Sequence, residues 1–431
     1  MFCPAVRLAF SVALLALCSP AHAADWPRWR GPAGTGHVPA DWPMPAKLHS
    51  DLPPLWKVKV GEGVASPVVA GGKVFLMEKL NEQETATAYD AATGKQLWAV
   101  PVDASFEDTQ GIGARCTPMV DDGRAYFQSR KGILQVLNAA DGRPLWRKDF
   151  VKDFGAQFIG ETSSKEAVGA IRHGYNGQPV VDGDSLIVIA GGRSGASVVA
   201  LDKKTGVLIW KSQSDAPGYA PATIATIHGT KQVVVFTADG CIGLAFDDGA
   251  LLWRMPIKTT WARHVTTSVV VDDMVLVSSH EHGVFGLKVS KEGAGFKAEQ
   301  AWLNKEAAIH FSSPVAVGRH LYGLGPKKDL ICLEIATGRI AWSQTGYMNT
   351  AGGQAHVGLI VMGKNILCLT DSGELVLFEA NPVAFKPVSR VQVSGITWSN
   401  PAYADGKLYL REGTGRKTAI AHLISVNLLA K

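Results

Sequence analysis

The feature that most constrains this chain is a short ending, Gly-x-x-x-Trp, that recurs along it. The five copies close at Trp98, Trp146, Trp210, Trp253 and Trp342. Trp56 and Trp302 stand at the same point of the repeat without the glycine, and successive tryptophans are 42, 48, 64, 43, 49 and 40 residues apart. A period of about 40 to 50 residues is typical of a propeller blade, so the repeat predicts one ring of blades rather than several separate domains.

Each interval between tryptophans shows the same order of signals. A small residue and a proline introduce an apolar strand, as in Ser66-Pro67-Val68; a tight turn such as Gly71-Gly72 follows, and then a β-branched or aromatic strand such as 233–236. These are hairpin signals, and no segment keeps an apolar period of 3.6 residues. The pattern predicts an all-β fold.

Counting the turns gives eight units, of which the last, ending at 424–429, has three strands and no closing tryptophan. The segment 55–60, which contains Trp56, is a closing strand with no blade before it. We therefore predict an eight-bladed β-propeller of four-stranded antiparallel blades, in which this N-terminal strand completes the last blade. A seven-bladed ring would leave a strand unpaired, and unpaired sheet edges are disfavoured.

The first 23 residues have the pattern of a signal peptide. Arg7 precedes an apolar run, 8–18, and Ala21-His22-Ala23 is a small-x-small cleavage site, so we expect cleavage after Ala23 and a periplasmic or secreted chain. Leu17 before Cys18 argues against a lipid anchor, and no stretch is long enough to span a membrane. Residues 24–54 show no strand pattern and are predicted to form an arm on the surface of the propeller, residues 55–431.

Charge and cysteine usage exclude further classes. The 43 Lys and Arg and the 38 Asp and Glu are spread along the chain without a basic block, so nucleic acid is not an expected partner. We also expect a monomer. Four cysteines follow the signal peptide, none with zinc spacing, so we expect buried free thiols and no metal site. A disulfide between Cys332 and Cys368, which lie in neighbouring repeats, remains open.

Candidate binding residues lie just before the first strand of each blade, where a propeller faces its central funnel. His173 stands beside them, at the end of an insert, 150–173, that we expect to cover one mouth of the channel. Polar and aromatic groups in a ring suit a polar ligand with a flat apolar face; the alternative is that a wet channel is simply polar. The candidates are Arg115, His173, Tyr175, Asn176, Tyr219, Arg263, His264, His310, Gln354 and Trp398.

No catalytic motif stands out in the sequence. It has no Gly-x-Ser-x-Gly elbow, no phosphate-binding loop and no His-Glu-x-x-His. His280 and His282 have a spacing that suits a metal, but no third ligand is evident and an exposed turn is the simpler interpretation. Glu161 and Glu166 in the insert could act as bases, but charged carboxylates on a loop are more often simply solvated.

These repeats resemble the pyrroloquinoline-quinone-like (PQQ-like) β-propeller family over the whole mature chain. The likeness extends to the segments 25–32 (DWPRWRGP), 310–314 (HFSSP) and 403–411 (YADGKLYLR). The family has two classes: quinoprotein alcohol dehydrogenases, and noncatalytic outer-membrane assembly scaffolds of the BamB type, which present loops to a protein partner. The repeat itself predicts the fold and not the function.

For the dehydrogenase class the resemblance implies PQQ in the funnel, calcium held by Glu, Asn and Asp, a catalytic Asp and a disulfide between adjacent cysteines. The chain has no Cys-Cys pair, and the ligand set has no matching positions. We therefore predict a BamB-like binding or scaffold propeller without catalytic activity, taking a protein partner or a small polar ligand. A PQQ- and calcium-dependent alcohol dehydrogenase is the alternative.

Overall fold

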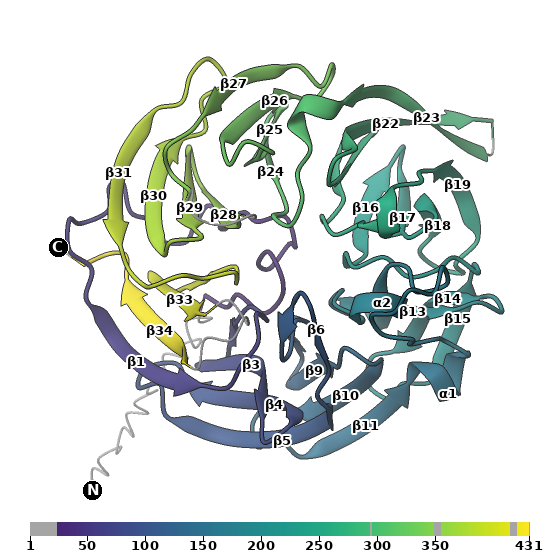
Figure 1. Cartoon of the computed structure of the whole chain (residues 1–431), viewed down its shortest axis with the longest axis horizontal. Helices are drawn as coiled ribbons and strands as arrows, with labels where there is room; N and C mark the ends of the chain where they lie inside the picture. Colours follow the sequence, from purple (N-terminus) through teal and green to yellow (C-terminus); the bar gives the residue numbers. More distant parts are fainter. Residues whose placement is uncertain (1–23, 294, 349–354, 414–419, 431) are drawn as a thin grey trace, which may run out of the picture.

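The computed structural model describes residues 24–293, 295–348, 355–413 and 420–430. The predicted signal peptide and Gln354 lie outside these residues. Eight four-stranded antiparallel sheets surround a common axis, with the first strand of each sheet nearest the axis and the fourth at the periphery (Figure 1). The predicted eight-bladed β-propeller is confirmed.

Blades 1 to 4 follow one another along the chain. Their strands are β2 (Val68–Ala70), β3 (Lys73–Leu80), β4 (Gln83–Asp90) and β5 (Gln96–Ala104); β8 (Met119–Asp121), β9 (Arg124–Gln128), β10 (Ile133–Asn138) and β11 (Pro144–Asp149); β12 (Val180–Asp182), β13 (Ser185–Gly192), β14 (Ala196–Asp202) and β15 (Leu208–Ser212); and β16 (Thr223–Ile227), β17 (Thr230–Thr237), β18 (Gly240–Ala245) and β19 (Leu251–Pro256).

Blades 5 to 8 complete the ring. Their strands are β20 (Val269–Val271), β21 (Met274–Ser279), β22 (Gly283–Glu292) and β23 (Gly295–Asn304); β24 (Val315–Val317), β25 (His320–Leu324), β26 (Leu330–Glu334) and β27 (Ile340–Gln344); β28 (Val357–Met362), β29 (Asn365–Thr370), β30 (Glu374–Glu379) and β31 (Pro387–Gln392); and β32 (Ala402–Ala404), β33 (Lys407–Glu412), β34 (Ala421–Asn427) and β1 (Pro54–Val60).

The ring closes in blade 8, where the two ends of the propeller meet. Strand β1 pairs antiparallel with β34, in a register that places Trp56 opposite Ser425 and Val60 opposite Ala421. Blade 8 thus takes three strands from the C-terminal end and its outer strand from the N-terminal end, as predicted. The pairing leaves neither end of the ring as an open sheet edge.

The recurrent glycine and tryptophan belong to one contact between neighbouring blades. A Cβ atom placed on Gly94 would lie 2.7 Å from the indole of Trp56, in the preceding blade, and one on Gly142 would lie 2.8 Å from that of Trp98. Gly94 also has φ of +73°, which side chains rarely adopt. Glycine is required because the indole packs directly on the backbone of the next turn, and the same contact recurs at Gly206, Gly249 and Gly338.

Apolar side chains from facing sheets form the core between the blades. Cys332 and Cys368 share one such cluster, yet both are free thiols, as are Cys116 and Cys241, and all four are buried. Burial raises the pKa of the Cys332 thiol to about 11. The structure therefore has buried thiols at the described cysteines and does not join Cys332 to Cys368.

Short elements outside the blades gather on one face of the ring. They are the hairpin β6 (Glu107–Asp108) and β7 (Gly111–Ile112), the helices α1 (Phe150–Phe154) and α2 (Ala170–His173) of the insert, and the 3-10 turns η1 (Thr260–Ala262) and η2 (Lys305–Ala307). Asp149 caps α1 by accepting hydrogen bonds from the next turn. No helix in the described ranges has the length and apolar character needed to cross a bilayer.

The N-terminal arm follows the inner strands from blade to blade. Its trace curls near the centre of the ring (Figure 1), where Trp26 pairs with Val69 of β2 and the backbone of Val38 bonds that of Val361 in β28. Farther along, the hydroxyl of Tyr403 donates to the carbonyl of Pro43. These contacts fix the arm to blades 7, 8 and 1, which are neighbours around the ring.

Candidate functional site: an axial cavity

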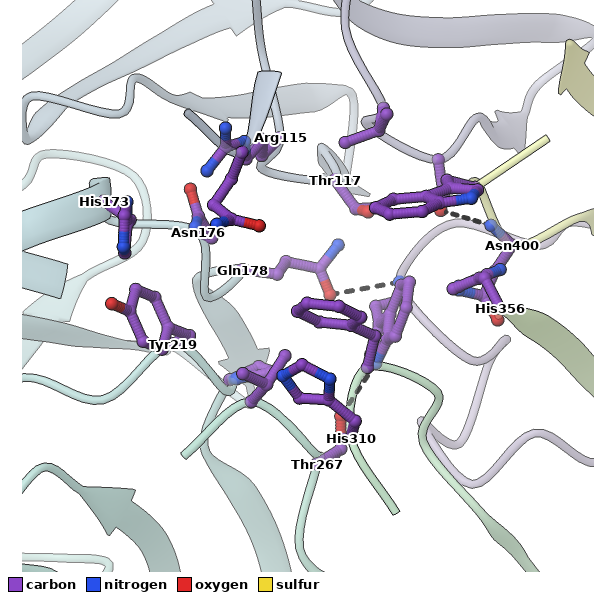
Figure 2. A pocket seen from close by; sticks show the side chains of 18 of the residues that line it. Arg115, Thr117, His173, Asn176, Gln178, Tyr219, Thr267, His310, His356 and Asn400 are labelled. Atoms are coloured by element: carbon purple, nitrogen blue, oxygen red, sulfur yellow. Dashed lines mark hydrogen bonds between the residues drawn. The ribbon is translucent and has the colours of Figure 1, made fainter. Parts of the chain in front are cut away.

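A cavity of about 220 Å³ lies on the axis of the ring (Figure 2). Every blade contributes to its wall through the segment that precedes its first strand, and the arm and the insert each add a residue. The hydrogen-bonding and charged members of this wall are Ser66, Gln110, Arg115, Thr117, His173, Asn176, Gln178, Arg263, Thr267, His310, His356 and Asn400.

The segments approach the axis in extended conformation, so alternate side chains face it. Arg115 and Thr117 face the cavity, as do Asn176 and Gln178, whereas the intervening Cys116 is buried between blades. The same alternation gives the segments of blades 1, 4 and 8 a pair of positions each and that of blade 5 three, Arg263, Val265 and Thr267, and the wall has two tiers. The upper tier is Val64, Arg115, Asn176, Tyr219, Arg263 and Trp398; the lower tier is Ser66, Thr117, Gln178, Pro221, Thr267 and Asn400.

This alternation corrects two predictions. His264 is fully buried, its Nδ1 lies 2.5 Å from the carbonyl oxygen of Thr237, and its ring stacks on Phe236. Burial lowers the pKa of His264 to about 4, so it is a neutral core residue. Tyr175 is also buried and donates its hydroxyl to the carbonyl of Gln157. Both lie one residue out of phase with the side chains that face the axis.

The structure brings most of the other candidates together. Those that line the cavity are Arg115, His173, Asn176, Tyr219, Arg263, His310 and Trp398. Whether they hold a ligand stays a prediction. His280 and His282 flank an exposed turn, in which His280 stacks on His310 with 3.9 Å between ring centroids. That pair supports the wall rather than forming a metal site.

The lower tier is the part of the site that the sequence analysis missed. These residues stand two positions before the first strand of their blade, and a signal for them existed. They follow an upper-tier residue by two positions, or by four for Thr267, on the same face of an extended segment. Trp29 had no such signal, because the arm has no strand pattern. Its backbone N–H donates to Gln178 and its indole N–H to Thr267, at 3.1 and 2.9 Å, so Trp29 spans the lower tier.

One wall of the cavity is aromatic. The ring of His310 stacks on Phe311 with 3.6 Å between centroids, and Phe311 lies 5.8 Å from Trp398. Burial lowers the pKa of His310 to about 3, with the nearby His280 and Arg263 adding to the effect, so this wall is uncharged at neutral pH. It offers flat π-surfaces to whatever enters.

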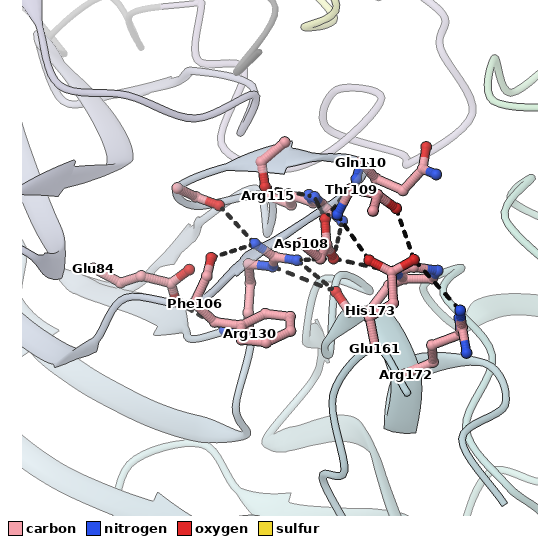
Figure 3. Close-up of polar contacts among 12 residues, drawn as sticks. Glu84, Phe106, Asp108, Thr109, Gln110, Arg115, Arg130, Glu161, Arg172 and His173 are labelled. Carbon is pink, nitrogen blue, oxygen red and sulfur yellow. Dashed lines mark hydrogen bonds and ion pairs between the residues drawn. The ribbon is translucent and has the colours of Figure 1, made fainter. Parts of the chain in front are cut away.

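A buried ion-pair cluster stands behind the opposite wall (Figure 3). Asp108, whose side chain is fully buried, accepts from Arg115 at 2.6 Å, from His173 Nδ1 at 3.0 Å and from Arg130. Burial, the largest effect, raises the pKa of this carboxyl, but the His173 hydrogen bond and the two guanidinium groups together lower it below its usual range. Asp108 therefore fixes Arg115 and His173 at the cavity wall.

The same cluster includes a group of three side chains that could ligate a metal ion. Ligand atoms of Asp108, Glu161 and His173 lie within 4.8 Å of one another. However, the oxygens of Asp108 are occupied by two guanidinium groups, whose positive charges disfavour a cation, and Glu161 accepts from Thr109 at 2.7 and 2.8 Å. We interpret the group as an ion-pair network.

A second cavity of about 140 Å³ adjoins the first at its upper end. The insert supplies Glu161, Arg172 and His173 to its lining, so the insert does reach the mouth of the axial cavity. Across from them lies Trp261, which is 45% exposed and has φ of +58°, a value that is costly for a bulky residue. The guanidinium of Arg172 lies 4.8 Å above its ring.

The chemistry of the site is that of a binding pocket. Along the described part of the chain, no Asp or Glu side chain lines the axial cavity. Its amides, hydroxyls and arginines can bind and orient a polar molecule, and its rings can stack on a flat one. Three histidines line the cavity: burial lowers the pKa of His310 to about 3 and that of His356 to about 4, and His173 is held by Asp108.

The chain matches one protein family over most of the propeller. A family model described as outer membrane protein assembly factor BamB matches residues 50–171 and 150–344. A protein of that description from Shewanella oneidensis is 24% identical over 67% of this chain and 60% of its own length. One from Yersinia pestis is 23% identical over 86% of this chain and 90% of its own length.

Solved structures share the fold at lower identity. BamB from Moraxella catarrhalis is 16% identical with a TM-score of 0.56, covering 88% of this chain and all of that one. A quinohemoprotein alcohol dehydrogenase from Comamonas testosteroni is 14% identical with a TM-score of 0.63, covering 95% of this chain and 81% of the other. At these identities the likeness extends to the fold alone, and the two structures are a BamB protein and an alcohol dehydrogenase.

Proposed function

Because the chain belongs to the family of the outer membrane protein assembly factor BamB, we propose that it is an exported, noncatalytic propeller that binds a protein partner during assembly of the outer membrane. The observation that carries the proposal is the family match across residues 50–344, together with an axial cavity whose described lining has no carboxylate. The predicted signal peptide, 1–23, supports a place in the periplasm.

The residues present do not fit the calcium of the dehydrogenase alternative. Calcium is bound by several oxygen ligands, usually with carboxylates among them, whereas the cavity offers the amides Asn176, Gln178 and Asn400 beside two arginines. The nearest carboxylate, Asp108, is already engaged by Arg115 and Arg130. A positive wall with no free carboxylate is a poor calcium site, which supports a binding function over catalysis.

The proposal is tested in the bacterium that encodes the chain. We expect deletion of the gene to lower the amount of folded outer-membrane proteins, and expect the full-length chain, but not one lacking residues 1–23, to restore it. Quantitative mass spectrometry of the outer membrane measures the effect. Unchanged outer-membrane protein levels after deletion would contradict the proposal.

The enzyme alternative has its own test. The purified chain is incubated with PQQ and calcium, and quinone absorbance and alcohol-dependent dye reduction are followed. We expect neither. Alcohol-dependent reduction that requires both additives would replace the scaffold proposal with a quinoprotein dehydrogenase.

A further inference from the structure

Among the residues that the structure describes, Arg263 lines the cavity without a charged partner. Arg263 lines both the axial cavity and its upper neighbour. Its guanidinium makes no hydrogen bond or ion pair with any residue that the structure describes, whereas Arg115 is paired with Asp108 and Arg172 with Glu161. Burial is the main cause that lowers the pKa of His310 and of His280, and the positive charge of Arg263 adds to it in both.

The chemistry of an arginine defines what would satisfy it. A guanidinium presents a planar set of donors that matches a carboxylate or phosphate in a bidentate arrangement. In a half-buried site such a pair is stronger than in water, because solvent competes less for the donors. An anion is therefore the complement of this side of the cavity.

The aromatic side chains of the cavity wall indicate whether the ligand is a simple anion or an anion that carries an apolar group. His310, Phe311 and Trp398 present uncharged rings to the cavity (Figure 2 labels His310), and Tyr219 stands on the other side. At the mouth, the strained backbone of Trp261 holds a further ring near Arg263. Aromatic walls favour a flat apolar group, which phosphate and acetate lack.

The volume limits how large that group is. An engineered apolar cavity of roughly 150 Å³ holds a single benzene molecule. The axial cavity is about 220 Å³, and Trp29 spans its lower end through its bonds to Gln178 and Thr267, so it does not continue through the ring on that side. One ring with a short charged substituent fits within the axial cavity itself.

We propose that the axial cavity binds a single-ring aromatic carboxylate, with its ring against Phe311 and Trp398 and its carboxylate paired with Arg263. The site lies inside the ring and takes a small molecule, so this inference goes beyond the scaffold function and is tested separately from it.

Titration calorimetry with 4-hydroxybenzoate as the probe tests the proposal, with 4-hydroxybenzamide as its neutral isostere and acetate as the anion without a ring. We expect 4-hydroxybenzoate to bind the wild-type chain, and the other two to bind at least tenfold more weakly. Arg263→Gln should weaken 4-hydroxybenzoate binding at least tenfold and abolish its advantage over the benzamide. Arg319→Gln, which changes an exposed arginine on the rim of blade 6, is the matched control and should bind as the wild type does.

Three outcomes would overturn the proposal: no binding of 4-hydroxybenzoate by the folded wild-type chain at millimolar concentration, equal binding of acid and amide, or unchanged binding by the Arg263→Gln protein. Circular dichroism confirms that the variants are folded. If these titrations fail while gene deletion still lowers outer-membrane protein levels, only the ligand site is wrong. If the titrations succeed and the deletion has no effect, the scaffold function is wrong and the site stands.

Discussion

At the scale of single residues, the polar groups buried beside the axis are held in protonation states that burial selects. Glu84 in β4 is almost fully buried, accepts one hydrogen bond from the backbone of Arg130 at 2.8 Å, and leaves its other oxygen without a partner. Desolvation raises the pKa of Glu84 to about 7, against an ordinary value of 4.5. The carboxyl is thus protonated in the folded chain under conditions in which the unfolded chain has already lost the proton.

We expect this residue to make stability depend on pH. As pH rises from about 4.5 to 7, Glu84 loses its proton in the unfolded state but keeps it in the folded state. The free energy of unfolding therefore falls, by about 3 kcal/mol once pH exceeds 7. Glu84→Gln has no carboxyl group to ionise at this position. Its free energy of unfolding should exceed that of the wild type by up to this amount at pH 8, and the contribution from ionisation should vanish at pH 4.5. Urea unfolding of both proteins at the two pH values measures it, and an equal difference at both would contradict the assignment.

At the scale of elements, the turn between the third and fourth strands of a blade is fixed by the blade before it. Gly94 lies in such a turn, between β4 and β5, whereas Gly123 lies in the turn between β8 and β9. Both have φ close to +70°. A Cβ at Gly94 would meet an indole, and nothing lies within 4 Å of a Cβ at Gly123. An alanine at either position would strain the backbone, but only an alanine at Gly94 would also disturb the packing between blades.

Replacing each glycine by alanine should therefore give different losses. Gly123→Ala is expected to cost about 1 kcal/mol, the price of a left-handed alanine. Gly94→Ala carries the same strain and also displaces Trp56, which adds about 1–3 kcal/mol of overpacking. Chemical denaturation of the two variants gives the comparison, and equal losses would show that the tryptophan contact does not stabilise the ring.

The seam between blades 8 and 1 has a polar tie of its own. Arg411 in β33 is fully buried and donates to the carbonyls of Met77 and Gly61, at 3.2 and 2.5 Å. Beside it lies Glu78, which accepts from Thr87 and Tyr89 at 2.6 Å each. The seam is thus closed by strand pairing, by the Trp56 contact and by a buried charge network.

We expect Arg411→Met to destabilise the chain by about 3–5 kcal/mol, because it leaves the buried carbonyls of Met77 and Gly61 without their donor and removes the positive charge that Glu78 attracts. Arg390→Met removes an exposed guanidinium that pairs with Glu374 at 2.6 Å, and such surface pairs contribute about 0–1 kcal/mol. Thermal unfolding of the two variants tests the contrast. Equal shifts would mean that the buried network does not hold the seam.

At the scale of the whole molecule, the ring places residues from all eight blades around one cavity. The sequence predicted this arrangement because each repeat carries the same local signals, and a closed ring of like units has only one axis. It also predicted that the N-terminal strand completes blade 8, since the last repeat lacks one strand and closure removes an open edge.

The sequence by itself determined the number of blades, their strands and the segments that face the axis, because these follow from local periodicity and from the need to pair every edge. Only the tertiary structure decided which side chains of those segments face inward, placing Arg263 in the cavity and His264 in the core. It also placed Trp29 next to Thr267, 238 residues away, and paired Asp108 with Arg115 but not with Arg263. Such contacts join segments distant in the chain, and no local pattern encodes a distance in space.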